Sequence, residues 1–179
     1  MLKVTRVRRK AIDRIAAFVE EENEKAYAEF SAVLDGEKVD GWKPAAALYD
    51  APLFAFSFYA LAIVHCYSLV ENNRALLCER LPGISRRERR SLHNIQTVTS
   101  CLNRARVQHD RTRCYRTMET FREVNNAIKH CRLGLSHEIV TRSGQKYEPK
   151  QLRALYARAK YLERYLEDLY RRVSNLHGQ

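Results

Sequence analysis

Residues 51–70 read APLFAFSFYALAIVHCYSLV and contain no formally charged side chain. A run of this length that is apolar on all sides is either a membrane span or the central helix of a bundle. The run also holds Ser57, His65 and Ser68, and no cluster of Lys or Arg adjoins it. We therefore favour a central helix over residues 52–80, surrounded by other helices, and expect no membrane partner.

Apolar residues at helical spacing predict four further helices: residues 3–34, a segment from Ser85 to about 107, residues 115–133 and residues 149–176. The last of these carries a narrow apolar seam with alternating steps of three and four. The seam consists of Leu152, Leu155, Ala159, Leu162, Leu166, Leu169, Val173 and Leu176. Long helices with short connections predict an all-α fold, an antiparallel helical bundle of about five helices in a single domain over residues 1–179.

Several residues mark where these helices begin and end. The segment DGEKVDGWKP at 35–44 contains two Gly and one Pro and predicts a break. Ser85 followed by Glu88 forms a capping-box pattern, which predicts a helix start at Ser85. Pro149 suits the first turn of the last helix. The segment SHEIVTRSGQKYEP at 136–149 is expected to be a loop, so no strand is predicted.

Positive charge dominates the chain and is unevenly distributed. The 32 Lys and Arg outnumber the 21 Asp and Glu, which gives a formal net charge of +11. Such a charge favours polyanionic partners such as nucleic acid or an anionic membrane surface, although a soluble basic domain without such a partner is also compatible with it. Residues 84–116 hold nine Arg and only two acidic residues. Arg suits phosphate through its forked donors, although SRRERRS could also be a solvated helix start. The candidate nucleic-acid-binding residues are Arg86, Arg87, Arg89, Arg90, Arg104 and Arg106.

The five cysteines do not indicate a disulfide framework or a metal site. Their number is odd, no CxxC occurs, and the six His show no paired metal-ligand spacing on one helix. The N-terminal segment is basic but lacks the apolar stretch of a secretory signal. We expect reduced thiols, a cytoplasmic location, no metal and no cofactor.

Residues 124–130, VNNAIKH, place two adjacent Asn before a His in a predicted helix. On a helical wheel, Phe121, Val124, Ala127, Ile128 and Cys131 form the apolar arc. Asn125 falls at the margin of that arc. The opposite arc carries Glu119, Arg122, Glu123, Asn126, Lys129 and His130.

The polar arc contains the side chains that metal-free phosphodiester chemistry requires. His130 can transfer a proton near neutral pH. Arg122 or Lys129 can stabilise developing negative charge. Asn126 can orient a phosphate or sugar hydroxyl, and Glu119 or Glu123 can fix the imidazole. A helix face of this composition is also common simply for solubility, so both interpretations stay open.

SFYALAIVHCYSLVENNRALL at 57–77, followed by FREVNNAIKHCRLG at 121–134, resembles the HEPN families (higher eukaryotes and prokaryotes nucleotide-binding). The likeness covers roughly residues 50–135. It implies an all-α bundle, a homodimer with facing motifs and, in many members, ribonuclease activity in toxin–antitoxin or defence systems. The family motif is usually Arg-Asn-x-x-x-His. Asn126 and His130 match its polar residue and its His, whereas Asn125 stands where the motif has Arg.

Three hypotheses follow for the function. The first is a metal-independent endoribonuclease with His130 as acid or base and Arg122 or Lys129 as charge stabiliser. The second is a catalytically inert HEPN-like protein that binds RNA, because Asn125 carries no charge for the scissile phosphate. The third is a helical protein-interaction or regulatory module, with a cognate antitoxin or regulatory protein as a possible partner.

Overall fold

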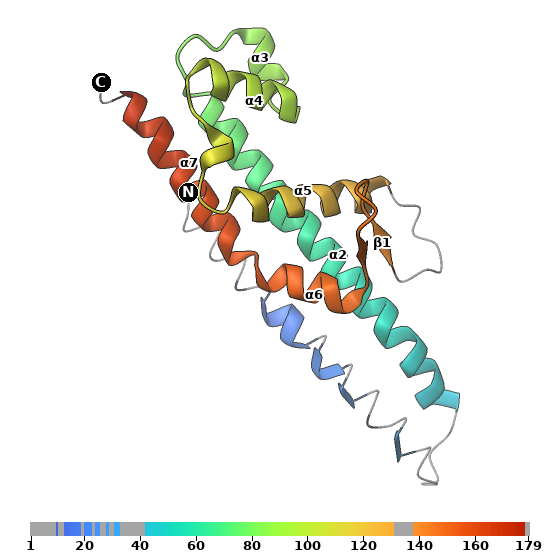
Figure 1. Cartoon of the computed structure of the whole chain (residues 1–179). Coiled ribbons are helices and arrows are strands. Elements are labelled where there is room, and N and C mark those ends of the chain that lie inside the picture. The colour runs from blue at the N-terminus through green and yellow to red at the C-terminus, as the bar shows by residue number, and fades with distance from the viewer. Residues whose placement is uncertain are drawn as a thin grey trace. The chain divides into compact units, whose positions relative to one another are not determined.

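The computed structural model describes residues 10, 13–18, 20–22, 24–25, 28, 31–32, 42–130 and 138–177. The chain divides into two compact units (Figure 1). Unit 1 comprises Met1–Ile63 and Val124–Tyr156, and unit 2 comprises Val64–Glu123 and Ala157–Gln179. Helix α2 (Trp42–Cys78) and helix α5 (Tyr115–His130) both continue from one unit into the other. The expectation of a single domain therefore stays a prediction.

Unit 1 combines an N-terminal helical segment, the first part of α2 and helix α6 (Pro149–Ala157). The described residues between 10 and 32 are all helical, as predicted. Two half-buried hydrogen bonds and one exposed ion pair join the three segments. The Tyr59 hydroxyl donates to Glu20 at 2.5 Å, Arg153 Nη2 pairs with the same carboxylate at 2.8 Å, and the Tyr156 hydroxyl donates to Asp13 at 2.7 Å. Polar groups on these otherwise apolar faces thus satisfy one another.

Helix α2 begins ten residues before the predicted start. Its first residue is Trp42, and Pro44 lies within its first turn. A proline in the first turn sacrifices no helical hydrogen bond, because the first N–H groups of a helix have no acceptor within it. The prediction that Pro44 belongs to a break was therefore wrong. No helix in the described part of the chain has the length and apolarity needed to cross a membrane.

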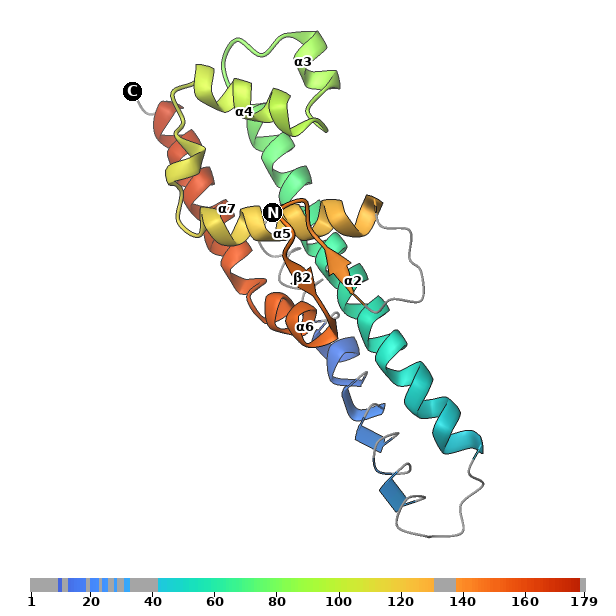
Figure 2. The same cartoon turned by 45° about the vertical axis from the view of Figure 1, so that its right-hand side comes forward.

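A short hairpin in unit 1 contradicts the prediction of a strand-free loop. Strands β1 (Ile139–Val140) and β2 (Lys146–Tyr147) pair antiparallel, with Ile139 opposite Tyr147 (Figure 2). The Thr141 side chain accepts from the Gln145 N–H, and Gly144 adopts φ 83° in the turn. Glycine occupies this left-handed conformation without a Cβ clash. Two-residue strands are too short for their period-two pattern to stand out from a loop.

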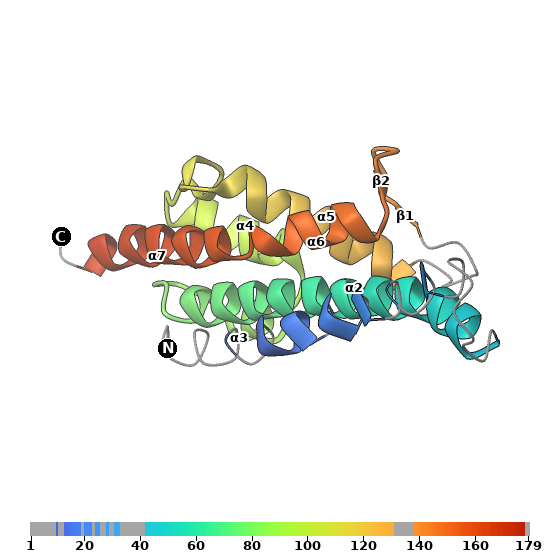
Figure 3. The same cartoon turned by 90° about the horizontal axis from the view of Figure 1, so that it is seen from below.

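Unit 2 contains the second part of α2, helices α3 (Arg86–Arg90) and α4 (Ile95–Arg104), the 3-10 turn η1 (His109–Arg111), the first part of α5, and α7 (Lys160–Ser174). A second 3-10 turn, η2 (Asn175–His177), follows α7. Helix α7 runs alongside the second part of α2 (Figures 1 and 3). Asp168 on α7 accepts from the Arg113 N–H at 3.0 Å and from Arg172 Nε at 3.1 Å, so α7 is tied to the segment that precedes α5.

The predicted third helix is two helices. Ser85 caps α3 through the complete capping box with Glu88, as predicted. Helix α3 ends after five residues, and Asn94 then caps α4 by accepting from the Gln96 N–H at 2.8 Å. Leu92 lies within this break and is buried, as is Val98 in α4. The apolar periodicity therefore survives the interruption, which is why spacing alone did not reveal it.

The predicted last helix is also interrupted, between α6 and α7. Pro149 is the first residue of α6, as predicted, and seven of the eight seam residues are buried. Leu176 is the exception at 36% exposure. The interruption lies at Arg158 and Ala159, whose carbonyls accept from residues three positions later. The all-α class is confirmed, and the described part of the chain contains about seven helices instead of the predicted five.

Candidate functional site

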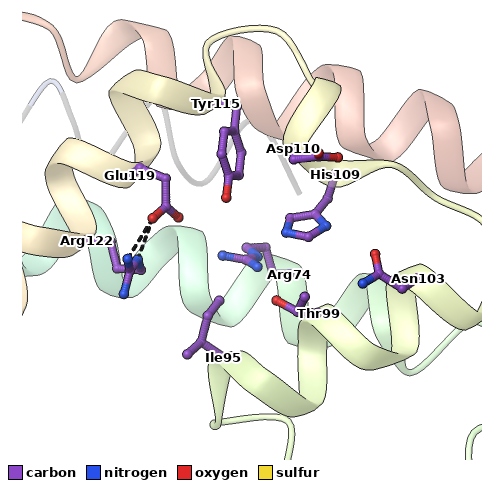
Figure 4. A pocket seen from close by; sticks show the side chains of 9 residues that line it. All are labelled: Arg74, Ile95, Thr99, Asn103, His109, Asp110, Tyr115, Glu119 and Arg122. Carbon is purple, nitrogen blue, oxygen red and sulfur yellow. Dashed lines mark hydrogen bonds and ion pairs between the residues drawn. The ribbon is translucent and has the colours of Figure 1, made fainter.

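Unit 2 contains a cavity of about 350 Å³ whose lining is polar and charged. Helices α2, α4 and α5 and the 3-10 turn η1 surround it (Figure 4). The lining residues are Arg74, Ile95, Thr99, Asn103, His109, Asp110, Tyr115, Glu119 and Arg122. A cavity of this size accommodates a small ligand. We refer to it below as the Arg74 pocket.

Arg74 lies at the centre of the pocket and is almost completely buried, with 1% of its surface exposed. It continues a buried stripe of α2 formed by Tyr67, Val70 and Cys78, so the helix itself carries its side chain inward. The guanidinium makes one internal contact, from Nη1 to the Met118 sulfur at 3.8 Å. Nε and Nη2 are buried and have no hydrogen-bond partner in the structure. A buried cation with unused donors is energetically costly, and it indicates a role that requires the charge.

His109 is the second buried polar side chain of the pocket. It lies on the turn η1, is 8% exposed, and leaves Nδ1 without a hydrogen-bond partner. Its ring meets Tyr115 edge-on at a centroid distance of 5.7 Å. Burial lowers the pKa of His109, and the positive charge of Arg74 lowers it further. The imidazole is therefore held mainly neutral beside the guanidinium, with a nitrogen available to a ligand.

Glu119 and Arg122 form an ion pair on one turn of α5. Arg122 Nε and Nη2 lie 2.8 and 2.7 Å from the Glu119 carboxylate, and both side chains are about 30% exposed. The pair raises the pKa of Arg122. Figure 4 shows the pair at one side of the pocket, with the Tyr115 hydroxyl pointing toward Arg74. The Glu119 carboxylate is thus already engaged by an arginine other than Arg74.

Burial also perturbs the groups behind the pocket. It raises the pKa of Tyr165 to about 12 and that of the Cys78 thiol to about 12, and it raises the pKa of Tyr67 as well. The Arg74 charge opposes each of these three shifts. The guanidinium therefore exerts its field in an apolar region where charges are weakly screened.

The motif residues predicted at 125–130 lie in unit 1, on the last turns of α5. Asn126, Lys129 and His130 are exposed, in agreement with the polar arc. Asn125 falls at the margin of the apolar arc on the helical wheel, and the structure shows its side chain fully buried. Its amide nitrogen reaches Asn126 Oδ1 at 3.4 Å, and its own Oδ1 has no hydrogen-bond partner in the structure.

The remaining predicted residues all lie in unit 2. Glu119 and Arg122 belong to the Arg74 pocket, and Glu123 is exposed. Arg86, Arg87, Arg89, Arg90 and Arg106 are exposed in unit 2. Arg104 is also exposed but pairs with Glu88 at 2.7 Å, and this lowers the pKa of Glu88 to about 2. Arg106 adopts φ 59°, a conformation that is uncommon for residues other than glycine.

Sequence reasoning missed Arg74, His109 and Tyr115. Arg74 carried a usable signal, because it follows Tyr67 and Val70 at steps of three and four and thus falls on the apolar stripe. A charged residue at such a position is seldom buried unless it is paired or functional. His109 carried no comparable signal, since it lies in a segment without periodicity, and Tyr115 was recognised only as the start of a predicted helix. In the part of the chain that the structure describes, no cluster of His, Cys, Asp or Glu could hold a metal ion.

Comparisons with protein-family models, curated proteins and solved structures found no match for this chain. The functional argument therefore rests on the residues and on the geometry of the two units.

Proposed function

We propose that this chain is a HEPN-like helical protein that binds RNA, and that unit 2 carries the main RNA-binding surface. The observation behind the proposal is the charge of that unit. Unit 2 holds 17 Lys and Arg against nine Asp and Glu, so it carries +8 of the net +11. Charge of this density attracts phosphate backbones irrespective of sequence.

The arginines of α3 support the proposal by their exposure. Arg86, Arg87 and Arg90 are exposed on a helix that buries none of its residues. The α3 carboxylate, that of Glu88, is occupied by its cap and by Arg104, so it does not neutralise these three side chains. Exposed guanidinium groups on a short, well-capped helix are available for phosphate contacts.

Binding can be tested by titrating full-length protein with fluorescent single-stranded RNA at increasing salt. We expect the affinity to fall steeply with salt, because each phosphate contact releases counterions. Replacing Arg86, Arg87 and Arg90 by Gln should weaken binding. The slope of log affinity against log salt should also become smaller, by the amount that corresponds to about two to three phosphate contacts. The matched control replaces Lys160, Arg164 and Arg171 on α7, which are also exposed cations of unit 2. Equal losses in both triple variants would contradict the assignment of the surface to α3, and a flat salt response would contradict RNA binding.

A second candidate function is metal-independent RNA cleavage at the exposed turn with Asn126, Lys129 and His130. In this reaction the ribose 2′-oxygen attacks the adjacent phosphorus as its proton passes to a base. The bond to the 5′-oxygen then breaks as that oxygen gains a proton, which leaves a 2′,3′-cyclic phosphate. His130 would serve as acid or base, and Lys129 would stabilise the phosphorane charge.

The geometry supports RNA binding better than cleavage. Asn125, at the position of the motif arginine, is buried and uncharged, and Arg122 is engaged by Glu119. Incubation of the protein with RNA in EDTA tests cleavage directly. Products that disappear with His130→Ala would establish the nuclease, whereas intact RNA would leave the binding function. If RNA neither binds nor is cut, the remaining alternative is a protein-interaction or regulatory module, as a homodimer or with an antitoxin-like partner.

A further inference from the structure

We propose that the Arg74 pocket is a binding site for a phosphate monoester, held through the free edge of the Arg74 guanidinium. The pocket lies entirely in unit 2 and contains none of the exposed arginines on which the proposed RNA surface rests. The inference therefore goes beyond general RNA binding and does not depend on it.

The unused donors of Arg74 define the geometry of the ligand. Nη1 contacts the Met118 sulfur, while Nε and Nη2 have no protein partner. Nε–H and Nη2–H lie along one edge of the planar guanidinium and point in the same direction, so together they can hold two oxygens of one oxyanion. A buried arginine that leaves this edge empty is preorganised for such a ligand.

The other polar groups of the pocket indicate a ligand with more than two oxygens. The His109 imidazole, with Nδ1 unpartnered, lies beside the guanidinium, and the Tyr115 and Thr99 side chains bring hydroxyl groups to the same space (Figure 4). A carboxylate has two oxygens, which the Arg74 edge alone would occupy. The three terminal oxygens of a phosphate monoester can use that edge and a further donor as well.

Two carboxylates also line the pocket and must be compatible with an anion. Glu119 is paired with Arg122, so that pair contributes little net charge. Asp110 is exposed to solvent, where its charge is screened more strongly than that of buried Arg74. The buried charge is therefore positive, and the phosphate group is expected at Arg74 with its ester substituent directed toward the open side of the pocket.

A phosphate monoester is present both on a mononucleotide and at the 5′ end of a phosphorylated RNA. Isothermal titration calorimetry with AMP, inorganic phosphate and adenosine identifies the group that is recognised. We expect AMP and phosphate to bind and adenosine not to bind. If a 5′-phosphorylated oligonucleotide binds more tightly than its 5′-hydroxyl form, the ligand is an RNA 5′ end. If the two oligonucleotides bind equally well and AMP still binds, the ligand is a free nucleotide.

Arg74→Met tests the pocket itself, because methionine fills much of the same volume without charge. We expect the variant to stay folded and to lose AMP affinity by about tenfold or more, since two charge-assisted hydrogen bonds disappear. Arg80→Met is the matched control, since it removes an exposed cation just beyond the end of α2. His109→Gln provides a second variant and should also weaken AMP binding.

Three results would overturn the inference. They are the absence of binding by both AMP and phosphate, equal AMP affinity in wild type and Arg74→Met, and binding of adenosine as tight as that of AMP. The outcome is separable from the RNA-binding proposal, because the α3 triple variant should still bind AMP and Arg74→Met should still bind RNA through the exposed arginines.

Discussion

The exposed turn around His130 and the Arg74 pocket differ in how their polar groups are held. At the turn, Asn126, Lys129 and His130 are exposed side chains on one face of a single helix. In the pocket, Arg74 and His109 are buried, come from separate elements, and retain donors or acceptors without partners. Solvated polar groups are present on most helix faces, whereas buried unpaired groups are costly and rarely kept without a use. The pocket is therefore the better supported ligand site, although the turn is the easier one to find in a sequence.

The largest effect is expected at Asn125, where arginine would restore the family-like motif. Because this side chain is fully buried, Asn125→Arg should lower the free energy of unfolding by about 3 kcal/mol or more, through an unpaired buried charge. The neighbouring change Asn126→Arg serves as control and should alter stability by at most about 0.5 kcal/mol, because that position is exposed. Urea denaturation measures both. A stable Asn125→Arg protein that cuts RNA would make the His130 turn the better supported functional site.

Removal of the buried Arg74 charge should instead increase the stability of the protein. Without phosphate in the buffer, Arg74→Met is expected to raise the free energy of unfolding by about 1–3 kcal/mol, because an unpaired buried cation is replaced by an apolar side chain. Arg80→Met should change stability by at most about 0.5 kcal/mol. If Arg74→Met is instead strongly destabilised, the guanidinium has a structural role and the contrast between the two regions weakens.

The pH dependence of stability should report on His109. Its folded pKa is lowered by burial and by Arg74, while Asp110 and Glu119 oppose the shift only weakly. The unfolded chain therefore binds the proton more readily, so stability should fall as the pH drops from about 7 to about 5. The pKa values of Glu88 and Asp168 are also lowered, but carboxylates of this kind lose stability mainly below about pH 4.5. Urea denaturation at a series of pH values measures this dependence. In His109→Gln the free energy of unfolding should change less between about pH 7 and 5 than in the wild type. An equal change in both proteins would argue against a buried neutral imidazole.

The smallest effect on stability is expected from His130→Ala. The side chain is exposed, so the free energy of unfolding should change by no more than about 0.5 kcal/mol. RNA affinity should also stay close to that of the wild type if unit 2 carries the main binding surface. Fluorescence anisotropy with labelled RNA checks this, and a large loss of affinity would place the turn in the RNA-binding surface.

The helical class could be predicted because apolar spacing records which residues are buried. Leu152, Leu162 and Leu169 are buried as their positions in the seam require. Helix interruptions could not be predicted in the same way, because burial continues across them, as it does from Leu155 through Ala159 to Leu162. At Arg158 and Ala159 neither Gly nor Pro marks the break.

The pocket could be predicted only at single residues. Glu119 and Arg122 were recognised because they share one face of one helix. Their association with Arg74 and His109 depends on how separate segments fold together, and periodicity within one helix contains no information on this. Asn125 shows the complementary difficulty, because a residue at the edge of an apolar arc becomes exposed or buried according to what lies against it.

The central claim is that Arg74 is a ligand-binding charge with a free edge. NMR of the arginine side chains tests it most directly, with the Arg74 Nε–H resonance assigned by its absence in Arg74→Met. Titration with AMP should shift this resonance saturably and slow its exchange with water, while adenosine should leave it unchanged. An Arg74 Nε–H signal that does not respond to AMP or phosphate, in a protein that is otherwise folded, would contradict the account.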